Sequence, residues 1–129
     1  MFIEFDLMPN SLTSSTYTQL LQQLEEKRNS KAILLAAVHL DMDLLAPLYE
    51  TICGIPNNYP LDIVFYSRGG VVNAARRIAL LLHDYCSQIR FLIPHYCESA
   101  GTIAILSADE IIAGPIAIFS PIDPILSAS

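Results

Sequence analysis

The chain has 129 residues and a mass of 14.2 kDa, which corresponds to one domain of ordinary size. Hydrophobic residues make up 53% of it and charged residues 16%, so its apolar surface can offset the entropy lost on folding, and disorder over most of the chain is excluded. The net charge of −6, with only 7 Lys and Arg residues, argues against nucleic acid and against an anionic membrane surface, since both are bound by clustered cations. So apolar a small domain indicates that the chain self-associates or is a fragment of a longer one.

Targeting and metal-binding signals are missing from the sequence. Glu4 and Asp6 stand where a secretory signal would have Lys or Arg, and no uninterrupted run of about 18 apolar residues suits a membrane span. The three cysteines, Cys53, Cys86 and Cys97, lack the spacing of a zinc site or a disulfide framework and are expected to be buried, reduced thiols. We therefore expect a cytoplasmic protein without metal or cofactor, which reaches a membrane only through additional segments.

The first half of the chain alternates between apolar runs of strand length and amphipathic helical patterns. The run KAILLAAVHL suggests a strand buried on both faces. In chain order, we expect an extended arm over residues 1–10, a helix from Ser14 or Ser15 to Asn29, a strand over 31–40, a helix capped by Asp41 or Asp43 and running to Ile52, and a loop over 54–60.

The second half repeats this alternation more sharply. We expect a strand over 61–67, a helix over 71–85, a strand over 88–96, a helix over 99–108 that is buried because it is apolar nearly all round, and a strand over 110–119 bent at Gly114-Pro115. Strands that alternate with helices in this way predict an α/β fold with a mainly parallel sheet and right-handed crossovers.

Two strand-to-helix turns carry the chemistry. The sequence Ser-Arg-Gly-Gly at residues 67–70 allows a tight turn that exposes backbone N–H groups, and Glu-Ser-Ala-Gly-Thr at residues 98–102 places Ser99 at the start of a helix. The carboxyl ends of neighbouring parallel strands lie at one edge of a sheet, so the two turns should face each other. This arrangement suits a nucleophilic serine beside an oxyanion hole, although either turn alone has a structural interpretation: a simple Gly-Gly turn, or Ser99 as a helix N-cap.

A resemblance to a known family rests on three segments, LDIVFYSRGG (61–70), IRFLIPHYCESAGTIAILSADEIIAG (89–114) and SPIDPIL (120–126). They resemble the Clp-protease-like superfamily with its crotonase-type fold, and within it the serine dehydrogenase proteinase family, whose relatives include signal peptide peptidase A. The resemblance implies repeated β-β-α or βαβ units with a mainly parallel sheet. It also implies one Clp-protease-like domain over residues 1–129, truncated at its C-terminus.

The same resemblance implies roles for particular residues. Ser99 matches the nucleophile, Ala100 supplies the backbone N–H after it, and Gly69 and Gly70 match the other wall of the oxyanion hole. Arg68 departs from the family pattern, which has a proline before the two glycines. That departure puts the shape of the substrate groove in question.

The general base is the element that the chain lacks. Clp-type peptidases carry a histidine where residues 120–124 fall, but Asp123 is the only ionisable residue there, and the lysine used by signal-peptide-peptidase relatives has no counterpart after Lys31. His95 is an internal candidate whose alternative is a structural histidine at a strand end, and Asp123 could orient a base or cap a turn. The base therefore comes from outside the chain or from another subunit, or the protein is inactive.

Three functions remain open. The first is a serine peptidase that acts on a peptide or protein substrate; the second is a catalytically inactive subunit that forms homo-oligomers. The third is a crotonase-like acyl-CoA enzyme, which ranks last because four arginines are the only nearby cations for the CoA phosphates. Near the site, Glu98 is expected at its mouth, and Cys97 could be accessible because it lies two positions from Ser99.

Overall fold

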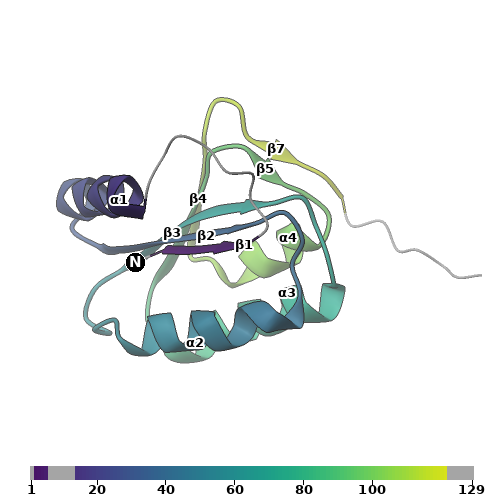
Figure 1. The fold of residues 1–129 in the computed structure, drawn as a ribbon, viewed down its shortest axis with the longest axis horizontal. Coiled ribbons are helices and arrows are strands. Elements are labelled where there is room, and N and C mark those ends of the chain that lie inside the picture. The colour runs from purple at the N-terminus through teal and green to yellow at the C-terminus, as the bar shows by residue number, and fades with distance from the viewer. Residues whose placement is uncertain (1, 6–13, 122–129) are drawn as a thin grey trace, which may run out of the picture.

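One curled sheet forms the framework, and all of its strand pairs among the described residues are parallel (Figure 1). The computed structural model describes residues 2–5 and 14–121. The strands lie in the order β1 (Phe2–Phe5), β2 (Lys31–Ala37), β3 (Leu61–Ser67), β4 (Ile89–Ile93) and β6 (Glu110–Ala113), while β5 (Tyr96–Cys97) pairs with β3 and with β7 (Ile118–Phe119).

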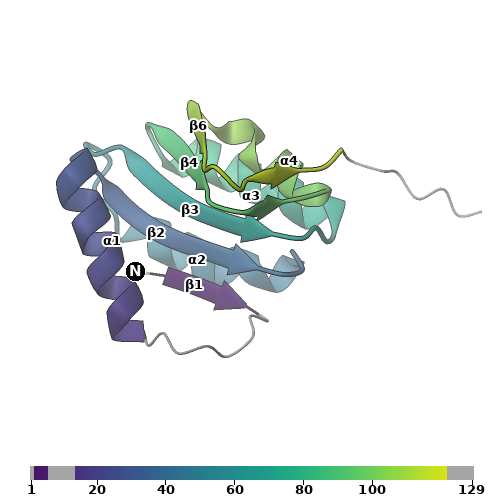
Figure 2. The ribbon, with the colours of Figure 1, turned by 90° about the horizontal axis from the view of Figure 1, so that it is seen from above.

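Helices connect the strands and cover the sheet. They are α1 (Ser14–Arg28), α2 (Leu45–Cys53), α3 (Val72–Tyr85) and α4 (Ala100–Ala104), with 3-10 turns at Met42–Leu44 and Ile105–Ser107. The helices α2 and α3 lie on one side of the sheet and α1 on the other (Figures 1 and 2). The predicted α/β class and its parallel sheet are confirmed.

The core lies between the central strand β3 and the helices α2 and α3. Phe65 of β3 is fully buried and meets Phe91 of β4 edge to face, with ring centroids 5.5 Å apart. On α3, the buried stripe includes Ile78 and Leu82, which face the sheet at helical spacing. This packing fixes the direction in which β3 runs and therefore the place where its carboxyl end emerges.

Several element boundaries follow the sequence prediction closely. The helix α1 begins at Ser14, and the strand β3 covers residues 61–67 as expected. Of the two candidate caps, Asp41 performs the role: its side chain accepts a hydrogen bond of 2.9 Å from the N–H of Asp43 in the 3-10 turn that leads into α2.

Two predicted strands are each broken in the structure. The run 88–96 divides into β4 and β5 around Pro94, and the run 110–119 divides into β6 and β7 around Gly114-Pro115. Proline has no N–H for the ladder, and both runs contain one at the same level of the sheet. The N–H of Gly114 still bonds the Ile93 carbonyl at 2.8 Å, so the paired kinks stay together. As a result β5 moves to the end of β3, where Cys97 is the register partner of Ser67.

The prediction of a helix buried on all sides over residues 99–108 is wrong at its end. The helix α4 stops at Ala104, and the chain continues as a 3-10 turn. Gly101 and Ala104 are buried, but Leu106 is 76% exposed. No described helix is both long enough and apolar enough to cross a membrane.

The cysteines differ from the expectation of three core thiols. Cys53 is exposed because it ends α2 on the outer side, Cys86 is half-buried, and Cys97 is fully buried in β5, so the expected accessibility of Cys97 is also wrong. Burial raises the pKa of Cys86 and of Cys97 to about 11.

Thiol labelling should separate these residues. At pH 8 iodoacetamide should modify Cys53 rapidly and leave Cys97 unmodified until the protein is denatured, because only the exposed thiolate reacts. Peptide mass spectrometry locates the adducts, with Cys53→Ser as the control that removes the rapid phase. Rapid native modification of Cys97 would contradict the buried position of β5.

A buried carboxylate anchors the start of β3. Asp62 is fully buried and accepts hydrogen bonds from Arg28 Nε at 2.8 Å, from Ser30 Oγ at 2.6 Å and from Arg90 Nε at 2.8 Å. Burial by itself raises the pKa of this carboxyl, but the hydrogen bonds from Arg28, Ser30 and Arg90 outweigh it, so the pKa lies below its usual value of 3.8. The group joins α1, the turn before β2, β3 and β4, and the sequence analysis did not identify it.

Asp62→Asn should lower the free energy of unfolding at pH 7 by about 3–5 kcal/mol, because two arginines lose a buried partner. The pKa of Asp62 in the folded state lies below the usual value of 3.8, which applies to the unfolded chain. The stabilisation by Asp62 is therefore complete above pH 3.8 and is lost as the pH falls below 3.8 and through the folded-state pKa, so wild type and variant should converge in acid. Urea denaturation across pH measures both effects, with the exposed Glu26→Gln as control. A constant difference down to pH 2 would refute this account of Asp62.

Candidate active site

The two strand-to-helix turns lie side by side at the carboxyl ends of β3 and β5. Ser67 and Cys97 are register partners, and the N–H of Glu98 donates to the Ser67 carbonyl at 3.1 Å. Beyond this bond Gly69 directly faces Ser99: a Cβ on Gly69 would lie 3.2 Å from the Ser99 Cβ and 3.6 Å from its Oγ. The structure therefore brings together the two turns that the sequence analysis paired.

Both glycines of the first turn adopt a backbone conformation that favours glycine. Gly69 has φ +130° and Gly70 has φ +137°. The carbonyl of Gly69 accepts a hydrogen bond of 2.8 Å from Leu40 N–H, and Val71 N–H donates to the Leu40 carbonyl at 2.8 Å. A Cβ on Gly70 would lie 2.4 Å from the Leu40 nitrogen and oxygen, so no side chain fits. Leu40, in the segment after β2, thus fixes the shape of this turn.

Ser99 is also held at positive φ, with φ +52° and ψ −121°. Its N–H donates to Ser120 Oγ at 2.8 Å, and its carbonyl accepts from Thr102 Oγ1 at 2.6 Å and from Thr102 N–H at 3.0 Å. Its side chain makes no capping hydrogen bond to α4, and Oγ bonds no described residue. A strained non-glycine residue costs about 1–3 kcal/mol and persists only where its surroundings hold it, which often marks a functional site.

Backbone donors flank Ser99. Within the described part of the chain, the N–H groups of Gly70 and Ala100 donate no hydrogen bond. The N–H of Gly69 is already used, since it donates to Ser67 Oγ at 3.1 Å. Of the N–H groups next to the contact between Gly69 and Ser99, those of Gly70 and Ala100 are therefore the ones that bond no described residue.

The candidate base His95 makes no hydrogen bond to Ser99. The ring of His95 is half-buried and stacks on Tyr96 with centroids 3.9 Å apart, and its Nδ1 lies 3.3 Å from the Ile116 carbonyl oxygen. His95 thus contacts the turn before β7. Asp123 lies outside the described residues. The described groups thus leave the Ser99 hydroxyl without a proton acceptor.

A charged and aromatic cluster borders the two turns. Arg68 forms an ion pair with Glu98, and its guanidinium lies 3.9 Å from the centroid of the Tyr96 ring. The hydrogen bond to Glu98 raises the pKa of Arg68 above its usual value. The sequence analysis did not pair these two residues, because their proximity follows from the register of β3 and β5. Arg68 comes directly after Ser67, Glu98 comes directly after Cys97, and Ser67 and Cys97 are register partners.

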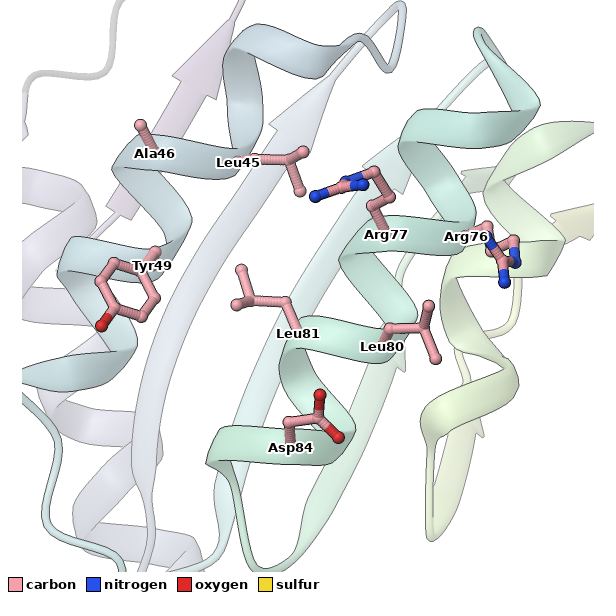
Figure 3. Close-up of a pocket in the computed structure, with 8 residues that line it drawn as sticks. All are labelled: Leu45, Ala46, Tyr49, Arg76, Arg77, Leu80, Leu81 and Asp84. Carbon is pink, nitrogen blue, oxygen red and sulfur yellow. The ribbon is translucent and has the colours of Figure 1, made fainter.

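A groove of the described surface lies away from the two turns. It has a volume of about 490 Å³ and lies over α2 and α3, where Figure 3 shows Arg77 of α3 extending towards Leu45 of α2. None of its lining residues belongs to the two turns.

A curled parallel sheet of this kind, with its helices and turns, defines the class of Clp-protease-like α/β proteins. The chain belongs to the family of ClpP-like SDH-type serine proteinases, whose family model matches residues 2–129. This confirms the family suggested by the three sequence segments.

Two relatives come from Methanocaldococcus jannaschii. The uncharacterized protein MJ0137 is 32% identical over 119 residues, which cover 82% of this chain and 42% of that protein. The uncharacterized protein MJ1495 is 38% identical over 69 residues, which cover 54% of this chain and 24% of that protein. The chain thus spans less than half the length of these curated relatives. No solved structure matches it significantly.

Gly70→Ala should lower the free energy of unfolding by at least ~2 kcal/mol, because alanine is strained at this φ and its Cβ overlaps Leu40. Gly54→Ala is the matched control: Gly54 has φ −84° and its nearest Cβ contact would be 3.6 Å, so its stability should be unchanged or rise by up to ~1 kcal/mol. Urea denaturation compares them, and equal stabilities would refute the tight approach of Gly70 to Leu40.

Proposed function

We propose that the protein is a serine peptidase in which Ser99 is the nucleophile and the N–H groups of Gly70 and Ala100 form the oxyanion hole. One observation carries the proposal: a strained serine with an unbonded hydroxyl lies opposite Gly69, and the N–H groups of Gly70 and Ala100, which follow these two residues in the chain, bond no described residue. Membership of a serine proteinase family supports the same reaction class.

The proposed reaction follows from this geometry. Ser99 Oγ attacks the carbonyl carbon of a peptide bond and loses its proton to a base, while the carbonyl oxygen becomes an oxyanion that accepts hydrogen bonds from Gly70 and Ala100. Collapse of this intermediate releases the amine, which takes up the proton, and leaves an ester on Ser99. Water then attacks the ester and releases the carboxylic acid, which restores the free hydroxyl.

The general base of this proposal comes from outside the described residues, in the same polypeptide or in a neighbouring subunit. Support comes from the absence of any described group bonded to Ser99 Oγ and from the length of the relatives, of which the chain covers 42% and 24%. A serine hydroxyl without such a partner is a weak nucleophile, so the activity of the whole protein depends on that group.

Assembly into a homo-oligomer is part of the proposal. Large apolar side chains are exposed along β6, the turn after it and β7, at the end of the described strand order. They are Ile111, Ile116, Ile118 and Phe119, with exposed fractions between 42% and 63%. An inactive assembly subunit would expose the same surface, so chemistry at Ser99 has to separate the two functions.

Fluorophosphonate labelling of the full-length protein tests the proposal. The wild type should form one covalent adduct, which Ser99→Ala abolishes without changing the fold, whereas Ser107→Ala, whose hydroxyl bonds the Ala104 carbonyl away from the site, should label normally. Intact-mass spectrometry measures the adduct. A folded, assembled wild type that never labels would favour the inactive subunit, and tight CoA binding in calorimetry would favour the acyl-CoA enzyme.

A further inference from the structure

The ion pair between Arg68 and Glu98 joins the two turns of the candidate site. Arg68 immediately precedes Gly69, and Glu98 immediately precedes Ser99. We propose that this pair is a positioning device, which holds the two turns together so that the N–H groups of Gly70 and Ala100 converge on one oxygen. The catalytic consequence of this inference rests on the proposed function, but whether the ion pair holds the two turns together can be tested separately.

The backbone supplies few other links at this point. The last backbone hydrogen bond between β3 and the segment after β5 runs from Glu98 N–H to the Ser67 carbonyl. Beyond it, within the described residues, the ion pair is the direct polar link between residues 68–70 and residues 98–100. Its removal would leave the two turns attached to different elements, one to Leu40 and the other to Ser120.

An aromatic ring supports one face of the Arg68 guanidinium. It lies over the Tyr96 ring at 3.9 Å, and that ring in turn contacts Tyr66 edge to face with centroids 6.0 Å apart. A cation on an aromatic face is held in place as well as attracted. Arg68 therefore presents its Nε to Glu98 from a supported position, unlike a freely moving surface arginine.

The pair also has an electrostatic consequence. An uncompensated carboxylate at Glu98, one residue before the nucleophile, would oppose the negative charge that develops beside Ser99. Arg68 neutralises it, and the side chains are 46% and 20% exposed, so the pair contributes little to global stability. Its loss should therefore affect the site far more than it affects unfolding.

Arg68 stands at the position where the resembled family pattern has a proline. A proline usually precedes the two glycines, and proline restrains the backbone by itself because its φ is fixed. In this chain the restraint instead comes from a side chain that reaches across to the other turn. The departure in sequence is thus compatible with the same arrangement of the two glycines.

Hydrogen exchange of the full-length protein tests, without using activity, whether the ion pair between Arg68 and Glu98 holds the two turns together. Arg68→Gln should speed the exchange of the hydrogen-bonded amides in the two turns, and the charge-reversed double variant Arg68→Glu with Glu98→Arg should restore most of the protection. These amides belong to Arg68, Gly69, Val71, Glu98, Ser99 and Gly101. Arg76→Gln, on an exposed arginine of α3 without an ion pair among the described residues, is the control and should change neither turn. Unchanged exchange in Arg68→Gln would overturn the proposal.

Labelling kinetics test the catalytic consequence. Arg68→Gln should slow fluorophosphonate labelling of Ser99 by roughly 10- to 100-fold, the effect of weakening one oxyanion donor, and the charge-reversed pair should recover to within about threefold of wild type. A wild type that never labels would refute the proposed peptidase. In that case hydrogen exchange would still show whether the ion pair holds the two turns together. Labelling by wild type and Arg68→Gln at equal rates would overturn the positioning role while leaving the peptidase intact.

Discussion

The short parallel pairing of β5 with the end of β3 determines where every residue of the candidate site lies. Parallel strands place their carboxyl ends at one edge of the sheet, so a pairing between Ser67 and Cys97 makes the two following segments neighbours although thirty positions separate them in sequence. Because β5 is only two residues long, this pairing depends on the kinks beside it. The prolines that break the longer apolar runs are therefore part of how the site is built.

Backbone conformation, more than any side chain, shapes the site. Gly69, Gly70 and Ser99 all have positive φ, and each is fixed by contacts from another part of the chain: Leu40 for the glycines, Ser120 and Thr102 for the serine. Such strain is retained only where surrounding packing exceeds its cost. The buried core of β3 and α3 supplies that packing, and the Asp62 network holds the opposite end of the same strand.

Charge is used differently at the two ends of β3. Asp62, at the beginning, is fully buried and compensated by two arginines, so it contributes to holding α1, β3 and β4 together. Arg68 and Glu98, at the end, remain partly exposed, where an ion pair contributes little to stability but can still set local geometry. The same residue types thus serve the fold in one place and the site in the other because their exposure differs.

The sequence by itself determined the alternation of strands and helices, the parallel sheet and the two turns, because hydrophobic periodicity and glycine are local signals. It also predicted that Ser99 and the Gly-Gly turn meet, since strand ends in a parallel sheet share one edge. Only the tertiary structure decided that two apolar runs break into four strands, that Cys53 is exposed, and that Gly69 gives its N–H to Ser67. Those outcomes depend on which strands pair and at which register, and register is a property of contacts between distant residues that no local pattern contains.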